Sequence, residues 1–223
     1  MKNYLFLFII YIFWLCTLFA QSYESSSSFT IARIKYHGGG DWYSNPSSLP
    51  NLLKFIKDHT TMDVASQEVR VELTDERLFS YPVLYMNGHG NVHFNENEVE
   101  YLRRYLTGGG FLHADDNYGM DKSFRREIKK IFPDQELVEL PFNHGIYSIF
   151  FKFPDGIPKI HEHDGGPGHG YGIFYENRLV VYYSFNTDLG DGWEDPDVHK
   201  DPEEKRIAAL KMGTNIIMWA LTH

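Results

Sequence analysis

The chain contains a single cysteine, Cys16, in 223 residues. It lies in an apolar N-terminal stretch, residues 5–19, which follows the basic Lys2 and ends at the small residue Ala20. A short apolar run with these flanks is typical of a secretory signal peptide rather than of a membrane anchor. We therefore expect residues 1–20 to be removed on export. The mature protein would then have no disulfide, no thiolate metal ligand and no cysteine nucleophile.

Positive charge is also scarce, with 21 Lys and Arg against 30 Asp and Glu and a formal net charge of −9. Nucleic acids and anionic membrane surfaces are disfavoured as partners, because both require a basic face. No stable membrane span is expected after the signal peptide is cleaved. Small molecules, glycans, cations and envelope proteins remain as partner classes. A disulfide-free export product of this size suits the bacterial periplasm or exterior.

The chain has no internal repeat and no second domain boundary. A Ser-rich segment, residues 21–28, follows the leader, and its composition predicts a flexible tether. The remainder, residues 29–223, is long enough to form a single domain with a sizeable core.

Residues 81–119 predict a strand, a helix and a second strand. The apolar run 82–86 stops at a glycine-rich turn, and a second apolar run begins after three successive glycines. Between the two runs, Asn95 and Glu98 form the halves of a capping box, and Gly108 can supply the left-handed cap at the end of the helix. Such a unit forms a right-handed crossover between parallel strands, and ligands bind beyond the carboxyl ends of such strands.

Alternation and periodicity predict further elements on both sides of this unit. Strands are expected at residues 29–36, 69–73, 137–140, 147–153 and 178–185, and helices at residues 50–59 and 124–132. A last helix is expected to be capped by Asp201 and to bury Ile207, Leu210, Thr214, Ile217 and Leu221. The expected fold is a three-layer α/β sandwich with a mainly parallel sheet and antiparallel additions in the C-terminal half.

Several motifs together resemble a known family. They are RIKYHGGGDWYSNPSSLPNLLKFI, LFSYPVLYMNGHG and LRRYLTGGGFLHADD, followed by a late HGIY, a Trp in an acidic loop and a helix with MGTNIIMWAL. This combination resembles the bacterial domain of unknown function 4159 (DUF4159) over nearly all of residues 29–221. That family looks like a divergent branch of the class I glutamine amidotransferase-like superfamily. The resemblance implies a flavodoxin-like fold, and it implies no activity.

The comparison with true class I amidotransferases concerns their nucleophile. Their cysteine lies on a sharp turn after a strand, typically as Gly-x-Cys-x-Gly. The equivalent turn here, residues 113–119, contains no cysteine. Glutamine hydrolysis by the thiol route is therefore excluded by residue type, and Asp115 or Asp116 would occupy the position of the nucleophile.

Asp115, Asp116 and His89 are the candidate catalytic residues, because they follow the two neighbouring strands of the central unit. Past the end of a strand, two carboxylates can converge on one cation or one base and raise each other's pKa. The alternative for the aspartates is that one caps the following turn while the other is solvated. The alternative for His89 is a hydrogen bond to a nearby carbonyl in a tight turn.

The candidate ligand-binding residues lie on the same expected edge. The glycine-rich turn after the first strand lacks the spacing of either known phosphate loop. Its Trp42 can stack on a sugar or a substrate ring, and an equally good reading is an aromatic anchor of the core. For the late HGIY motif, a satisfied core histidine is the alternative to a polar site group. The candidate set is His37, Gly39, Asp41, Trp42, Asn87, Gly88 and His144.

His161, His163 and Asp164 are the candidate metal ligands, because His-x-His in an extended segment places both rings on one side. They belong to a His-, Asp- and Gly-rich loop, whose alternative role is a solvated connection. A second acidic segment, residues 188–198, offers carboxylates for a weak calcium site or forms a solvated face. A divalent metal is therefore the only cofactor that the sequence suggests.

Two function hypotheses follow from these residues. The first is a binding or scaffold domain of the bacterial cell envelope that kept an amidotransferase-like fold and lost its nucleophile. The second is a hydrolase that uses Asp115, Asp116 and His89, with or without a divalent metal. A serine hydrolase ranks third, because no Gly-x-Ser-x-Gly motif occurs.

Overall fold

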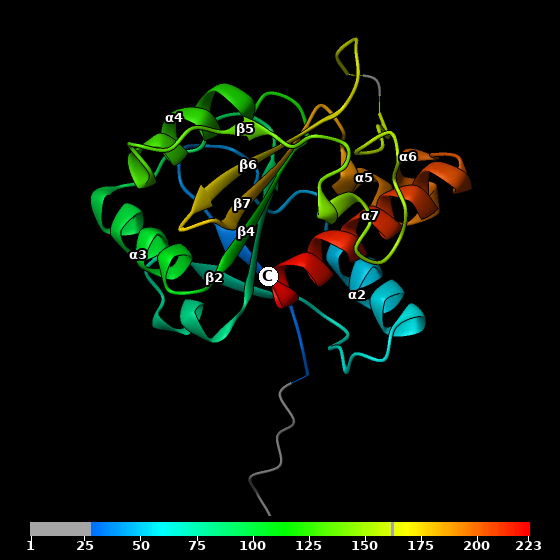
Figure 1. Cartoon of the computed structure of the whole chain (residues 1–223), viewed down its shortest axis with the longest axis horizontal. Coiled ribbons are helices and arrows are strands. Elements are labelled where there is room, and N and C mark those ends of the chain that lie inside the picture. Colours follow the sequence, from blue (N-terminus) through cyan, green and yellow to red (C-terminus); the bar gives the residue numbers. More distant parts are fainter. Residues whose placement is uncertain (1–27, 162) are drawn as a thin grey trace, which may run out of the picture.

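The computed structural model describes residues 28–161 and 163–223. The expected signal peptide, residues 1–20, and nearly all of the Ser-rich tether lie outside the described residues. The described chain forms a seven-stranded sheet with helices on both of its faces (Figure 1).

The sheet has the strand order β2-β1-β3-β4-β7-β6-β5. Strands β2, β1, β3, β4 and β7 run parallel to one another, whereas β6 pairs antiparallel with both β7 and β5. The mixed α/β class and the mostly parallel sheet are therefore confirmed. The strands are β1 (Ala32–Lys35), β2 (Val69–Glu72), β3 (Val83–Gly88), β4 (Phe111–Asp116), β5 (Val138–Glu139), β6 (His169–Tyr175) and β7 (Arg178–Phe185).

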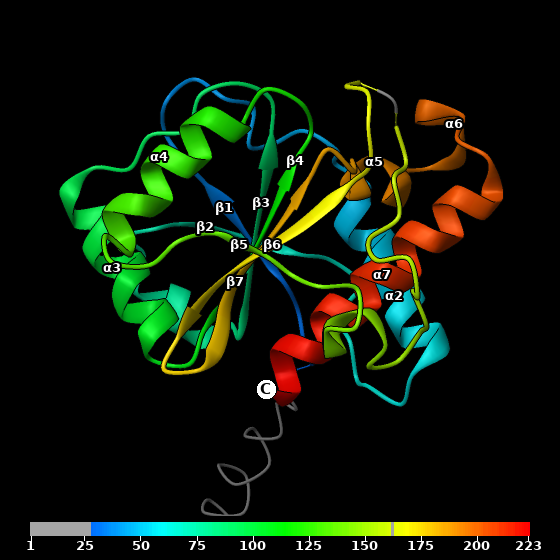
Figure 2. The same ribbon diagram turned by 45° about the horizontal axis from the view of Figure 1, so that its top comes forward.

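Helices cover the two faces of the sheet unequally. In Figure 2, α3 and α4 lie on one side of the strands, and α2, α5 and α7 lie on the other. The helices are α2 (Ser48–His59), α3 (Glu96–Thr107), α4 (Asp121–Ile131), α5 (Leu189–Trp193), α6 (Pro196–His199) and α7 (Glu203–Thr222), with 3₁₀ turns η1 (Glu76–Ser80) and η2 (Gly145–Tyr147).

Strand β3 is buried along its whole length. Its Leu84 and Met86 belong to the core cluster that includes residues of α3 and α4. Its Val83 and Tyr85 belong to the second cluster, on the side of α2 and α7. A strand covered on both faces is apolar throughout rather than alternating, which is why the run 82–86 could be recognised in the sequence.

The predicted capping box is present at the start of α3. The Asn95 side chain accepts a hydrogen bond from Glu98 N at 3.0 Å, and the Glu98 carboxylate accepts one from Asn95 N at 2.8 Å. The expected left-handed cap at Gly108 is wrong by one residue. Gly108 has φ −85°, and Gly109 adopts the left-handed conformation with φ +114°.

The C-terminal half departs from the sequence prediction in two places. The strand expected at residues 147–153 is wrong: after η2 this segment is irregular, and the Asn215 side chain of α7 hydrogen-bonds to both N and O of Phe151 at 2.8 Å. Strand β6 was not predicted. It pairs with β7 through a two-residue turn in which Glu176 and Asn177 both have positive φ, as a tight hairpin requires.

Helix α7 begins two residues after Asp201, so the predicted cap is wrong, and the Asp201 carboxylate instead lies 2.7 Å from His161 Nε2. The buried stripe was also predicted incorrectly in part. Ile207 and Leu221 are 36% and 37% exposed, whereas Met212 and Gly213 are buried. Gly213 packs closely, because a Cβ there would lie 2.7 Å from a Leu52 methyl group.

The buried guanidinium of Arg33 ties the start of α2 to the end of β3. It donates to Ser44 O at 2.9 Å, Asn87 Oδ1 at 2.6 Å, Asn45 O at 3.1 Å and Ser48 Oγ at 3.1 Å. Its side chain is 1% exposed and lies 3.7 Å from the Glu68 carboxylate. The planar fork of an arginine satisfies these acceptors together, which a lysine cannot do.

We expect Arg33→Lys to lower the free energy of unfolding by about 3 kcal/mol, because it leaves buried acceptors without donors. Chemical denaturation of the purified protein measures this loss. The matched control is Arg70→Lys on β2, at the register position beside Arg33 and also paired with Glu68. That half-exposed residue should change the free energy of unfolding by less than about 0.5 kcal/mol. Equal effects of the two substitutions would contradict the anchoring role of Arg33.

Candidate metal centre

The chain folds back over the carboxyl ends of the strands after β7. Asn186 and Asp188 have positive φ values of 56° and 53°, which turn the backbone away from β7 and into α5. In Figure 2 the arrowheads of β3 and β4 point to the top of the view, and α5 lies beside them. This arrangement brings an acidic segment against the edge at which the sequence predicted a site.

Asp115 holds α5 against the sheet. Its fully buried carboxylate accepts hydrogen bonds from Gly190 N at 2.7 Å, from Ser184 Oγ of β7 and from Tyr85 of β3 at 3.4 Å. Burial raises its pKa to about 7, and the hydrogen bonds from Ser184 and Gly190 oppose this rise. The carboxylate faces α5, so its role here is to connect β3, β4, β7 and α5.

A histidine also joins this buried network. His113 Nε2 lies 2.8 Å from Ser184 Oγ. Burial lowers the pKa of His113 to about 3, so the ring is neutral. The order of contacts is His113–Ser184–Asp115, in which the carboxylate binds the serine rather than the histidine. A hydrolytic triad needs the carboxylate on the imidazole and an accessible serine, so this set is structural.

Asp116 caps the turn between β4 and α4. Its carboxylate accepts hydrogen bonds from Tyr118 N at 3.1 Å and from Met120 N at 3.0 Å. Burial raises its pKa, and these backbone hydrogen bonds oppose the rise. Of the two readings open from the sequence, this geometry corresponds to the capping aspartate. The two neighbouring carboxylates therefore serve different partners.

His89 pairs with Asp41 rather than with Asp115. Its Nδ1 lies 3.0 Å from Asp41 Oδ2, and its backbone N also donates to the Asp41 carboxylate. The ring is about half exposed. The preceding Gly88 has φ +142°, and a Cβ there would lie 2.2 Å from the Tyr36 hydroxyl. Glycine is thus required for the backbone to bring His89 to Asp41.

The other candidate ligand-binding residues make contacts within the fold. Asn87 is buried and is used by Arg33 and Ser44. His37 lies 3.5 Å from Glu98, and Lys35 lies 5.7 Å from the Trp42 ring. The His144 and Trp219 rings are tilted by 49° with their centroids 4.8 Å apart, and Gly39 is in a left-handed turn with φ +93°. His144 also accepts a hydrogen bond from Ile146 N.

Two of the three predicted metal ligands converge with a residue of α5. Ligand atoms of His161, His163 and Asp191 all lie within 4.8 Å of one another. Within the described residues, Asp164 is not part of this group. His161 Nδ1 is 3.0 Å from Asp191 Oδ2, while its Nε2 lies 2.7 Å from Asp201 Oδ1. The sequence could not pair Asp191 with the histidines, because only the turn after β7 brings the two segments together.

Asp188 extends this group with an unsatisfied buried oxygen. It is 2% exposed, and its Oδ2 lies 3.7 Å from His163 Nε2. Its Oδ1 has no hydrogen-bond partner among the described residues. Burial, reinforced by the charges of Asp115 and Asp191, raises its pKa to about 8. An unpaired buried carboxylate is costly unless a proton or a cation compensates it.

Asp191 is held in place by amides and faces one more imidazole. Its Oδ1 accepts hydrogen bonds from Asn45 at 2.6 Å and Asn117 at 3.2 Å, and lies 3.8 Å from His199 Nε2. Sequence reasoning missed His199, although it directly follows the acidic segment. The His161 and His199 rings lie 5.0 Å apart. Imidazoles beside carboxylates favour zinc-like ions over calcium, which prefers oxygen ligands.

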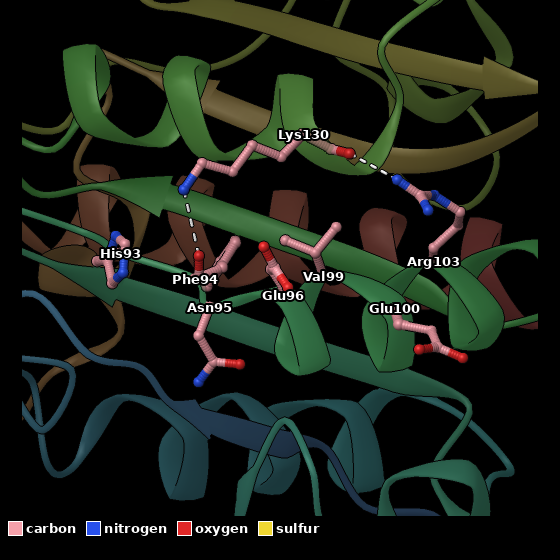
Figure 3. Close-up of a pocket in the computed structure, with 8 residues that line it drawn as sticks. All are labelled: His93, Phe94, Asn95, Glu96, Val99, Glu100, Arg103 and Lys130. Carbon is pink, nitrogen blue, oxygen red and sulfur yellow. Dashed lines mark hydrogen bonds between the residues drawn. The ribbon is translucent and has the colours of Figure 1, made fainter.

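An open groove of about 900 Å³ lies elsewhere, between α3 and α4 (Figure 3). Its two cationic side chains bond to the protein itself, since Lys130 donates to Phe94 O at 3.2 Å and Arg103 donates to Lys130 O at 2.6 Å. None of the candidate site residues that the structure describes lines this groove. The groove therefore does not coincide with the candidate site.

The fold and this cluster define an α/β protein with a histidine–carboxylate group at the carboxyl edge of a mostly parallel sheet. Residues 30–221 match the family described as a domain of unknown function, DUF4159, and the chain belongs to that family. This confirms the resemblance read from the motifs at the level of the family. No curated protein matches the chain. In the described ranges, no helix has the length and apolar character that crossing a membrane would need.

We expect Asp188→Asn to stabilise the metal-free protein at about pH 8 by about 2–4 °C in Tm. A carboxyl whose pKa rises from 3.8 to about 8 on folding binds its proton more tightly in the folded state. The stability that this tighter proton binding contributes is complete below about pH 4 and is lost as the pH rises towards 8. Asparagine is never charged there and tolerates the left-handed backbone of this position.

Thermal unfolding in the presence of a chelator, at about pH 5 and about pH 8, measures the effect. The advantage of Asp188→Asn should grow with pH. Asp164→Asn is the control, because Asp164 is exposed and outside the group, and it should leave Tm unchanged. A variant less stable than the wild type at the higher pH would show that the Asp188 carboxylate is already compensated.

Proposed function

We propose that this protein is an exported domain that binds a divalent transition-metal ion at the carboxyl edge of its sheet. One observation carries the proposal. His161, His163 and Asp191 offer ligand atoms within 4.8 Å of one another, beside the buried Asp188 whose Oδ1 has no partner among the described residues. A cation at this point would give that buried carboxylate oxygen a partner.

The donor set favours zinc. Two imidazoles with one or two carboxylates match the ligands of catalytic zinc sites, in which a position stays open for water or substrate. His161 would bind through Nδ1 while Asp201 accepts from its Nε2, and such an outer carboxylate fixes the ring and raises its basicity. His163 is 39% exposed, which leaves the site accessible from solvent.

The flavodoxin-like, amidotransferase-like classification belongs to the same proposal. Counted along the chain, the five parallel strands lie in the order 2-1-3-4-5, which is the flavodoxin-like order. Helices on both faces of the sheet agree with three layers (Figure 2). The cysteine of true amidotransferases is absent from the corresponding turn, so the domain would have kept the fold without the thiol chemistry.

The apolar leader supports export, and the proposed location is the bacterial periplasm or exterior. In this location the domain acts as a metal-binding member of the envelope. Its partners would be small molecules, glycans or envelope proteins, in keeping with its negative charge. This is the binding-domain hypothesis with its ligand class specified.

A second candidate function is a metal-dependent hydrolase, and the Asp41–His89 pair favours it. A carboxylate on Nδ1 fixes the tautomer of the imidazole and leaves Nε2 as a base. A bound zinc ion would lower the pKa of a coordinated water. In sequence, the turn that carries Gly119 lies between His89 and the proposed metal ligands. This turn also lies close to the residue after His89, because a Cβ at Gly119 would be 3.7 Å from Gly90 N.

Isothermal titration of chelator-treated protein with Zn²⁺ tests the metal proposal. We expect one ion per chain and a Tm increase of roughly 5–10 °C at a hundredfold excess over Kd. His161→Ala and Asp191→Ala should weaken binding more than about 100-fold, since direct ligands matter more than their outer partners.

His59→Ala is the matched control for these variants. His59 ends α2, and α2 begins at the carboxyl edge next to Asn45, so this exposed histidine lies at the opposite edge of the sheet. It should bind zinc as the wild type does. Absence of zinc binding by the wild-type protein, or unchanged binding by both ligand variants, would exclude the proposed centre.

The hydrolase candidate has a separate test. The zinc-loaded protein should cleave p-nitrophenyl acetate faster than the metal-free protein, and His89→Gln should reduce kcat/KM by about 10²–10⁴-fold without changing zinc affinity. His93→Gln is the control, because this half-exposed histidine also lies beyond β3 and pairs with Glu127. Equal rates with and without zinc would leave the protein as a binding domain.

A further inference from the structure

Tyr118 has an unusual backbone conformation for an aromatic residue. Its φ is +91°, whereas the six other described non-glycine residues with positive φ lie between 49° and 63° and are Asn, Asp, Glu or Lys. A bulky side chain with such a φ is strained. Strain of this kind persists only where the surrounding structure enforces it, and it is concentrated at functional sites.

Asp116 enforces this conformation. Its carboxylate binds the backbone N of Tyr118 and, two residues later, the backbone N of the buried Met120. The next residue, Gly119, also has φ +91°. The turn from β4 into α4 is therefore fixed from both sides, and a glycine or asparagine at position 118 would suit it better than tyrosine.

Burial in the core does not account for this tyrosine, because Tyr118 is 51% exposed. Its ring stacks on His163, with the centroids 5.2 Å apart and the planes at 30°. His163 Nε2 in turn lies 3.7 Å from Asp188 Oδ2. The imidazole is therefore held by Tyr118 against one face of its ring and by Asp188 at one of its nitrogens.

We propose that Tyr118 is a positioning residue that holds the His163 imidazole in place for a zinc ion bound by His161, His163 and Asp191. The inference rests on the proposed metal centre. It explains why a strained turn keeps an aromatic side chain that is half exposed. It also gives the turn that carries the nucleophile in true amidotransferases a different task in this chain, which is to orient a metal ligand.

The test separates backbone strain from metal binding. Tyr118→Gly and Tyr118→Asn should raise or preserve the Tm of the metal-free protein, because they relieve the strained φ, and should weaken Zn²⁺ binding by about tenfold. Tyr118→Phe keeps the ring and should bind zinc as the wild type does. Glu176→Gly is the matched control for strain relief, because Glu176 has φ +49° in the β6–β7 turn, and its zinc affinity should not change.

A double-mutant cycle with His163→Ala completes the test. Once His163 is removed, Tyr118→Gly should cause no further loss of zinc affinity, because the two residues act through the same contact. Independent losses that multiply, or wild-type affinity in Tyr118→Gly, would overturn the inference while leaving the metal centre intact. A wild-type protein that binds no zinc would instead overturn the proposed function.

Discussion

The buried carboxylate of Asp115 is the contact on which the carboxyl edge of this protein depends. It receives the N–H of Gly190 at the start of α5, the hydroxyl of Ser184 on β7 and the hydroxyl of Tyr85 on β3. These bonds hold α5 directly over the strand ends, and Asp191 on α5 thereby reaches His161. Burial raises the pKa of Asp115 to about 7, which shows that a charge at this position is unfavourable, and the hydrogen bonds to it offset part of that cost.

Two kinds of polar group lie at this edge of the sheet: those that hold the fold together and those that remain available for chemistry. Asn87, Asp115 and Asp116 form hydrogen bonds within the fold, and the Arg33 guanidinium donates four. The histidine–carboxylate group around Asp191 differs, because it combines ligand atoms at metal-binding distances with a buried oxygen that has no partner in the described chain. The proposed zinc centre and the proposed role of Tyr118 both rest on this difference.

Local interactions made part of the fold predictable. The capping box of α3 involves residues three apart, and β3 is apolar because both of its faces are covered. Prediction failed where distant contacts decided the outcome. The apolar segment after η2 is kept irregular by Asn215 of α7, and Asp201 is drawn from its expected cap to His161. The α7 stripe shifted for the same reason, because α2 and Trp193 select which residues are buried.

The sequence by itself determined the alternating strands and helices, the absence of cysteine from residues 17–223 and the residue types that gather at one edge of the sheet, because composition and short-range periodicity carry that information. It also placed His161 and His163 two residues apart. Only the tertiary structure decided that Asp191 joins them, that Asp115 holds α5 and that Asp116 forms a cap. Adjacent residues in a chain can face different partners once strands from distant segments align. The role of each carboxylate then depends on the hydrogen-bond donors that those segments bring to it.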